Sequence, residues 1–308
     1  MKASRIVRHV LQLALLGFVA WYVRAHWTEY RLVFQQSRPR WGELVGSSFL
    51  VLVAYIVLIQ TWRQVVDAWG ERLSFGSAMR IWFVANLGKY VPGKVWSIAA
   101  MGALAQEAGI SPVAAVGSSL VVTLVNLVTG FGVFFVVGAR AMHVPFGALA
   151  AVVLLGAALG GAPWLLPAAV RLANRLTGRN ITVPLLPPGA IWWAGAGTTL
   201  AWVLYGVAFD AFVNAMTDGA VHGSLGDWTA IFIGPYLVGF ITLFAPGGLG
   251  AREVAMAEAL QRTGLALGAV SALLVASSRI WLTVLEIIPG LLFLLVRPMD
   301  RPVPPSNR

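Results

Sequence analysis

Long apolar stretches alternate with short polar connections along most of the chain. Crossing a hydrocarbon core of roughly 30 Å as a helix takes about 20 predominantly apolar residues. The stretches that we interpret as membrane-crossing helices are residues 9–24, 44–62, 113–138, 146–170, 189–214 and 266–296. The pattern therefore predicts an all-α polytopic membrane protein with about six full spans.

Two further apolar regions, residues 75–110 and 228–263, are interrupted near the middle. Proline lacks the backbone N–H and breaks a helix, and glycine weakens the helix that remains. The interruptions "YVPGK" and "APGGLGAREVA" contain the helix breakers Pro92, Gly93, Pro246, Gly247 and Gly248. We expect each region to form two half-length helices in a re-entrant hairpin. Since irregular backbone at membrane depth must be buried in protein or face water, both turns should face an interior cavity.

The two halves of the chain resemble each other. Each Pro-Gly pair precedes a small-residue helix, ending "LAQEAG" in one half and "ALQRTG" in the other, and then a long span, at an offset of about 154 residues. Such repetition is typical of transporters, whose broken helices meet at the repeat interface. The alternative is a chance recurrence of Pro-Gly pairs and alanine-rich helices. We expect one transmembrane domain over 1–308, divided into a first repeat, a linking span, a second repeat and a disordered tail at about 41–138, 146–170, 189–296 and 298–308.

The charges of the loops predict an orientation. The N-terminal segment is basic, with Lys2, Arg5 and Arg8, whereas the loop at 215–227 contains aspartates and no Lys or Arg. The positive-inside rule then places both termini in the cytoplasm of a multi-pass cell-membrane protein, inner or plasma, and makes the repeat inverted. The loop at 24–43 disagrees, because it is arginine-rich yet falls outside in this arrangement.

Composition excludes several classes of function. Only 11% of residues are charged and 58% are hydrophobic, against about 25% charged in soluble domains. There is no cysteine, the four histidines are scattered, and no P-loop, G-x-S-x-G or H-E-x-x-H motif occurs. We therefore expect no enzyme, no metal and no cofactor. The net charge of +10 lies mainly at the ends of apolar segments, which favours anionic lipids over nucleic acid as partners.

Charges inside apolar segments are the candidate functional groups, since each costs about 2.5–3.5 kcal/mol at the bilayer centre. The candidates for binding an anionic headgroup are Lys89, Lys94, Arg252, Arg80 and Arg279. The carboxylates that we expect to serve coupling or structural roles are Glu253, Glu286 and Asp210. A half-helix that starts after a Pro-Gly turn adds the positive end of its dipole, so the pattern predicts an anion site near mid-membrane. In the alternative, the hairpins are shallow and the lysines snorkel to the interface.

Arg279 and Glu286 stand seven residues apart in one span. This spacing places them on one face of a helix, roughly 10 Å apart along its axis, which is too far for direct pairing. We expect each of them to contact another helix or a ligand.

The paired motifs "NLGKYVPGKVW" and "APGGLGAREVAMAEAL" resemble the flippase-like membrane family related to the N-terminal domain of lysylphosphatidylglycerol synthase. The resemblance covers most of the chain from about residue 40. It implies translocation of a lipid or lipid-linked precursor between leaflets. Bifunctional members also carry a soluble aminoacyl-transferase domain; this chain ends at Arg308, so we do not expect that synthetic activity.

The resemblance leaves the lipid open, because the family's substrates include aminoacylated phospholipids, with polyprenyl or hopanoid-type lipids as further candidates. The leading hypothesis is a lipid flippase that exposes a cavity between two inverted repeats alternately to each side. One alternative is a polyprenyl-phosphate-dependent glycosyltransferase. Another is a scaffold or accessory protein for envelope-biosynthesis enzymes that assemble lipid or glycan.

Overall fold

The computed structural model describes residues 39–90, 95–142, 187–242 and 250–295, together with isolated positions at 24, 150, 153–157, 160–161 and 175. Several sequence predictions lie wholly or largely outside these residues: the spans at 9–24 and 146–170, the tail at 298–308, Lys94 and both Pro-Gly turns. The described residues form helices and no strand, which agrees with the predicted all-α class.

Four of the described helices are long and apolar enough to cross a membrane. They are α3 (Trp41–Ala68), α6 (Pro112–Met142), α8 (Pro188–Thr217) and α11 (Gly268–Leu295). They coincide with the spans predicted at 44–62, 113–138, 189–214 and 266–296, which are therefore confirmed as long apolar helices. Periodicity is not needed for this prediction, because the length and apolar character of each stretch suffice.

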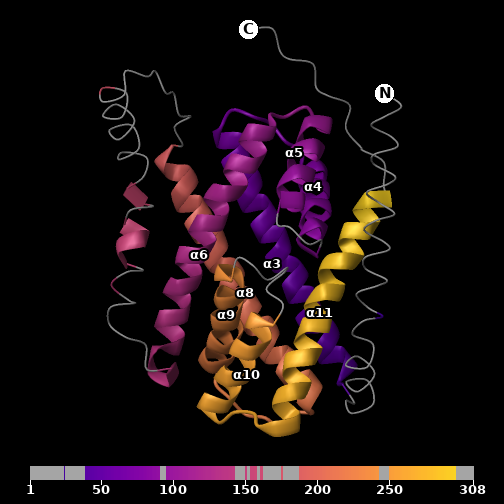
Figure 1. Ribbon diagram of the computed structural model, residues 1–308, viewed down its shortest axis with the longest axis vertical. Helices are drawn as coiled ribbons and strands as arrows, with labels where there is room; N and C mark the ends of the chain where they lie inside the picture. The colour runs from indigo at the N-terminus through magenta and orange to yellow at the C-terminus, as the bar shows by residue number, and fades with distance from the viewer. Residues whose placement is uncertain are drawn as a thin grey trace.

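Each interrupted region contains two shorter helices, as the sequence predicts. In the first region these are α4 (Phe75–Leu87), followed by a 3₁₀ turn at Gly88–Tyr90, and α5 (Val95–Glu107). In the second they are α9 (Leu225–Ile241) and α10 (Ala251–Thr263). A helix of 13 residues, such as α4, is about 20 Å long, half the length of the 28-residue α3. Figure 1 shows α4 and α5 at one end of the molecule and α9 and α10 at the other.

Helices α3 and α8 pack side by side at the centre of the bundle, and α6 and α11 flank them (Figure 1). Helix α6 also packs against α9, and α11 packs against α4, so each flanking helix contacts a short helix from the other half of the chain. Two buried tryptophans fix α6, because the indole N–H groups of Trp62 and Trp202 donate to the backbone oxygens of Ala115 and Asn126. The bundle therefore interlocks the two halves of the chain.

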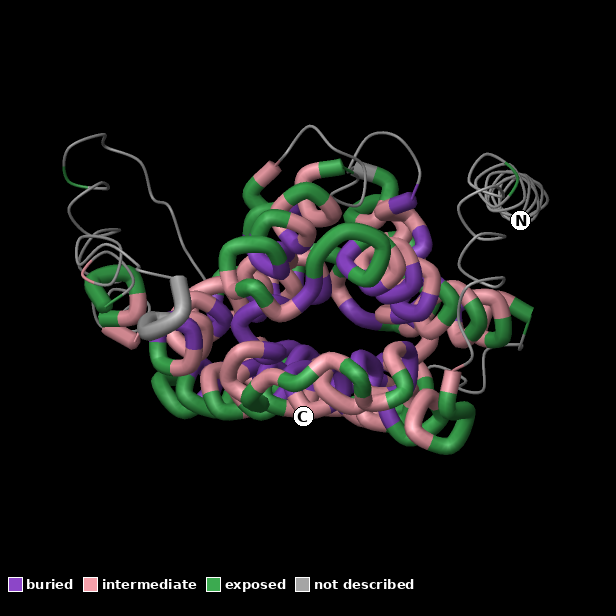
Figure 2. Tube along the Cα trace, turned by 90° about the horizontal axis from the view of Figure 1, so that it is seen from below, coloured by how far each residue is buried: buried purple, intermediate pink, exposed green. Residues whose placement is uncertain are grey.

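Buried residues face the inside of the bundle and exposed residues its outside (Figure 2). Many exposed side chains of the four long helices are large and apolar, among them Val45, Leu124, Val203 and Leu292. An outer surface of this kind suits contact with lipid rather than water.

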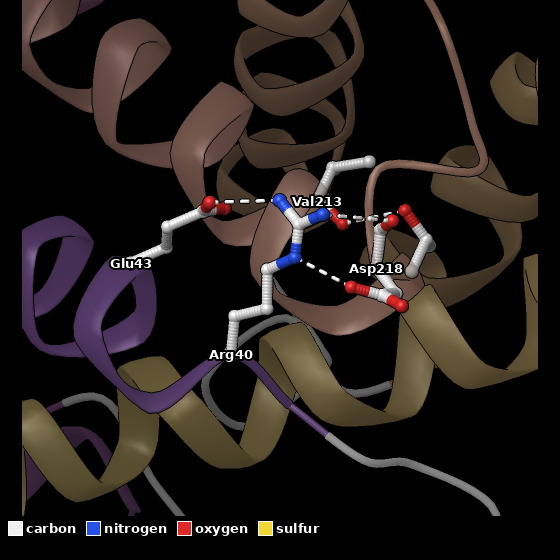
Figure 3. A network of polar contacts seen from close by, with 5 residues as sticks. Arg40, Glu43, Val213 and Asp218 are labelled. Atoms are coloured by element: carbon white, nitrogen blue, oxygen red, sulfur yellow. Dashed lines mark hydrogen bonds and ion pairs between the residues drawn. The ribbon is translucent and has the colours of Figure 1, made fainter.

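A polar network joins the start of α3 to the end of α8 (Figure 3). The Arg40 guanidinium donates to the Asp218 carboxylate at 2.5 Å and to Glu43 at 2.9 Å. Asp218 ends α8 in a left-handed conformation, with φ of 52°, which aspartate tolerates better than most residues. The hydrogen bond from Arg40 to the Asp218 side chain raises the pKa of the Arg40 guanidinium, and the hydrogen bond to Glu43 raises it by a smaller amount. The contact shows that the central pair is antiparallel.

Close approach of α3 and α8 depends on Gly197. A Cβ added there would clash with the Thr61 hydroxyl, which is fixed because it donates to the backbone oxygen of Val57. We expect Gly197→Ala to lower the free energy of unfolding by about 1–3 kcal/mol through overpacking. Gly195 on the same helix has open space at its Cβ position, so Gly195→Ala should be neutral or stabilise by up to about 1 kcal/mol. Thermal unfolding in detergent micelles measures both variants, and equal melting temperatures would contradict this packing.

Candidate functional site

In the first short-helix pair, the turn that follows α4 contacts a carboxylate from α11. Glu286 accepts an ion pair from Lys89 at 2.5 Å and a hydrogen bond from the Tyr90 hydroxyl. Its other oxygen accepts from the Tyr55 hydroxyl of α3 at 3.2 Å. Gly88, directly after α4, allows α5 to approach closely, because an added Cβ would lie 2.6 Å from the backbone nitrogen of Ser97 in α5. Glu286 thus joins the end of α4 to both α11 and α3.

The second short-helix pair is held by the other charged residue of α11. Arg279 forms an ion pair with Glu253, with Nε and Oε1 3.4 Å apart. The second oxygen of Glu253 accepts from the backbone N–H of Gly250 at 2.7 Å and so caps α10. Gly250 has a φ of 84°, a conformation that glycine adopts without strain. The sequence expectation that Arg279 and Glu286 contact other helices is confirmed.

Arg252, in the first turn of α10, has a different environment. Its guanidinium lies 5.5 Å from the ring centre of Phe232 and 5.6 Å from that of Tyr236, both in α9. Its Nη2 atom is buried and has no hydrogen-bond acceptor among the described residues. The two aromatic rings therefore position the Arg252 guanidinium, and its Nη2 donor has no acceptor in the part of the chain that the structure describes.

These groups form one electrostatic cluster. Arg252 and Arg279 repel each other, and both act on Lys89, while Glu286 attracts all three. The side chains of Lys89 and Glu286 keep 35% and 18% exposure, so the cluster borders open space rather than being sealed. We call these five residues the central charge cluster: Lys89, Arg252, Glu253, Arg279 and Glu286.

Tyrosines surround the central charge cluster. All four tyrosines among the described residues interact electrostatically with Glu286, and they come from α3, the 3₁₀ turn, α8 and α9: Tyr55, Tyr90, Tyr205 and Tyr236. The rings of Tyr55 and Tyr205 meet edge to face across the central helix pair, with centres 6.1 Å apart. Sequence reasoning missed these residues. The available signal was a phenolic hydroxyl in an apolar span, which needs a hydrogen-bond partner when buried.

Two of the predicted site residues lie elsewhere. Arg80 contacts Glu107 at 3.6 Å, where the start of α4 meets the end of α5, and so takes no part in the central charge cluster. Asp210 of α8 lines a groove of about 500 Å³ beside Arg40, Glu43 and Asn214. This groove belongs to the end of the bundle where α3 begins and α8 ends.

A smaller cavity of about 90 Å³ lies among α4, α5 and α6. Asn86, Ser97 and Ser119 provide its polar lining. The Ser97 hydroxyl is buried without a hydrogen-bond partner in the described residues. Polar side chains thus line a cavity next to the first interruption, in addition to those of the central charge cluster.

Comparisons with protein-family models, curated proteins and solved structures find no match to this chain. The structure itself defines an all-α protein with four apolar helices of membrane-crossing length. Within the residues described, ionisable side chains from both halves of that bundle meet at its centre.

The ion pair between Arg279 and Glu253 generates a stability prediction. Removing one partner leaves an unpaired, largely buried charge, so Arg279→Met or Glu253→Gln alone should cost about 3 kcal/mol of unfolding free energy. The loss of unfolding free energy in the double variant should be at least about 1 kcal/mol smaller than the sum of the two single losses, because both charges are removed and neither remains unpaired. Chemical unfolding in micelles gives the three values. Simple additivity would show that the two side chains do not depend on each other.

Proposed function

We propose that the protein is a lipid translocase, which moves an anionic lipid or lipid-linked precursor between leaflets without a cofactor. The observation that carries the proposal is the central charge cluster, in which the Nη2 atom of Arg252 is buried and has no acceptor among the described residues. A site of this kind suits a phosphate or similar oxyanion, because charged hydrogen bonds to an arginine fork are strong. The resemblance of the two Pro-Gly motifs to a flippase-like family points to the same function.

The cost of crossing the membrane explains why a cluster is needed. A headgroup with a net charge cannot cross hydrocarbon unless polar protein groups replace its hydration. In the described residues, the cluster and its tyrosines supply such groups at the centre of the bundle, between the short-helix pairs. The driving force would come from the membrane potential, from a proton gradient coupled through Glu286 or Asp210, or from simple equilibration.

Helix order and packing support an inverted repeat as the mechanical basis of transport. The series of long, short, short and long helices runs from α3 to α6 and again from α8 to α11. The contacts are reciprocal, since α6 packs on α9 and α11 packs on α4. The two short-helix pairs lie at opposite ends of the molecule (Figure 1). We infer that they are re-entrant hairpins from opposite membrane faces, whose relative movement exposes the cluster to each side in turn.

Transport is tested in vesicles that contain purified protein and a fluorescent anionic phospholipid. We expect lipid exchange between leaflets well above that of protein-free vesicles. Arg252→Gln should slow exchange about tenfold or more, because a charge-assisted contact contributes about 1.5–3 kcal/mol.

Arg262→Gln is the matched control. Arg262 lies in the same helix as Arg252, but its side chain is 74% exposed and pairs with Glu258. Exchange should be unchanged in this variant. Exchange no faster than in empty vesicles, over anionic phospholipids and polyprenyl lipids, would reject the translocase and favour the glycosyltransferase or scaffold alternatives.

Topology provides a separate prediction. Figure 1 places the α5–α6 and α8–α9 connections at opposite ends. Because the chain has no cysteine, Ser111→Cys should be labelled only from the cytoplasm and Ala220→Cys only from outside. Ala220 is exposed, and its replacement leaves intact the nearby Ser224 side chain, which caps α9. Labelling of both positions from one face would refute the inverted arrangement.

A further inference from the structure

The central charge cluster carries one uncompensated positive charge. Its members are three cations and two carboxylates, and each carboxylate pairs with one cation: Glu286 with Lys89, and Glu253 with Arg279. Arg252 remains. The count covers the described residues, to which Lys94 does not belong.

We propose that the site selects a lipid headgroup with a single negative charge, a phosphodiester, and that Arg252 makes the primary contact. This inference rests on the proposed translocase function and narrows its substrate class. Among the five headgroup candidates from the sequence, Arg252 differs because no ion pair joins it to a carboxylate in the described part of the chain, where its buried Nη2 atom also has no acceptor. Lys89, Arg80 and Arg279 each have a carboxylate partner.

The aromatic environment of Arg252 agrees with this role. Contact with the rings of Phe232 and Tyr236 holds the planar guanidinium without neutralising it. The position in the first turn of α10 adds the positive end of the helix dipole next to the same group. A phosphate oxygen at Nη2 would therefore meet a positioned donor and a favourable potential.

The net charge of the cluster limits the charge that a bound ligand can carry. A monoanion at Arg252 makes the cluster neutral, and the two existing ion pairs remain. A phosphomonoester dianion or a polyprenyl diphosphate would leave net negative charge in a largely buried site, where unpaired charge is costly. The exposed apolar side chains of the surrounding helices, such as Val254 in α10, indicate that the phosphodiester belongs to a lipid rather than to a soluble ester.

Dioleoyl phosphatidylglycerol and dioleoyl phosphatidic acid form a matched pair, because they share acyl chains and differ in headgroup charge. A phosphomonoester has a second pKa of about 6, so phosphatidic acid is mainly a dianion at pH 8.5, whereas the diester remains a monoanion. Native mass spectrometry of protein from nanodiscs with equal amounts of both lipids measures retention. We expect a preference for phosphatidylglycerol of about tenfold or more.

Two variants test the origin of the preference. Glu286→Gln keeps one of the two oxygens that accept from the Tyr55 and Tyr90 hydroxyls. It adds one positive charge to the cluster, so phosphatidic acid should bind at least as well as phosphatidylglycerol. Arg252→Gln should lose retention of both lipids. Glu258→Gln removes an exposed carboxylate of α10 that pairs with Arg262, and its selectivity should match that of the unmodified protein. Retention is measured on the monodisperse, folded fraction of each variant.

The outcomes separate the two proposals. Equal or stronger binding of phosphatidic acid by the unmodified protein, or an unchanged preference in Glu286→Gln, would overturn the one-charge limit while leaving the translocase intact. Failure to retain either lipid above neutral phosphatidylcholine would count against the translocase itself. Soluble glycerophosphoglycerol at the lipid's concentration should displace little phosphatidylglycerol, and full displacement would overturn the assignment to a lipid.

Discussion

The arrangement at the centre of this bundle depends on one constraint: a charge removed from water needs a partner. Helix α11 supplies two such partners, seven residues apart, and each holds a different short-helix pair. Glu286 holds the end of α4 through Lys89, and Arg279 holds the start of α10 through Glu253. A single long helix is thereby tied to elements from both halves of the chain. Breaking either ion pair leaves a costly unpaired charge, so the ties also restrict how the short helices move.

Much of this fold is predictable from sequence, because apolar length and helix breakers act locally. The four long helices follow from stretches of about 20 or more apolar residues, and the short ones from the interruptions at Pro92-Gly93 and Pro246-Gly247. A Pro-Gly pair alone is not decisive, because Pro289-Gly290 lies inside the continuous helix α11. The site is less predictable, since its contacts join distant positions. Lys89 and Arg80 look alike in sequence, yet Arg80 contacts Glu107, within its own short-helix pair, while Lys89 reaches α11. Only the packing of α4 against α11 distinguishes them.

The tyrosines illustrate a second limit of sequence reasoning. Tyr55 and Tyr205 stand in apolar spans where an aromatic residue needs no special explanation. Their proximity to Glu286 arises because α3 and α8 pack closely, a feature that depends on small residues such as Gly197 facing Thr61. Burial of a phenol without an acceptor is unfavourable, so the carboxylate and the tyrosines stabilise each other. The polar site therefore depends on the close central packing.

In the proposed translocase, the two carboxylates would also explain how a basic site releases its ligand. Three cations without them would attract a phosphodiester strongly, but a translocase must let the headgroup leave on the other side, so binding has to be favourable without becoming a trap. Glu286 and Glu253 neutralise Lys89 and Arg279 and leave the excess charge at Arg252. The same pairing keeps the cluster from carrying three unpaired charges at the centre of the bundle. In the proposed translocase, moderate attraction for the ligand and stability of the buried charges would thus have a common physical cause.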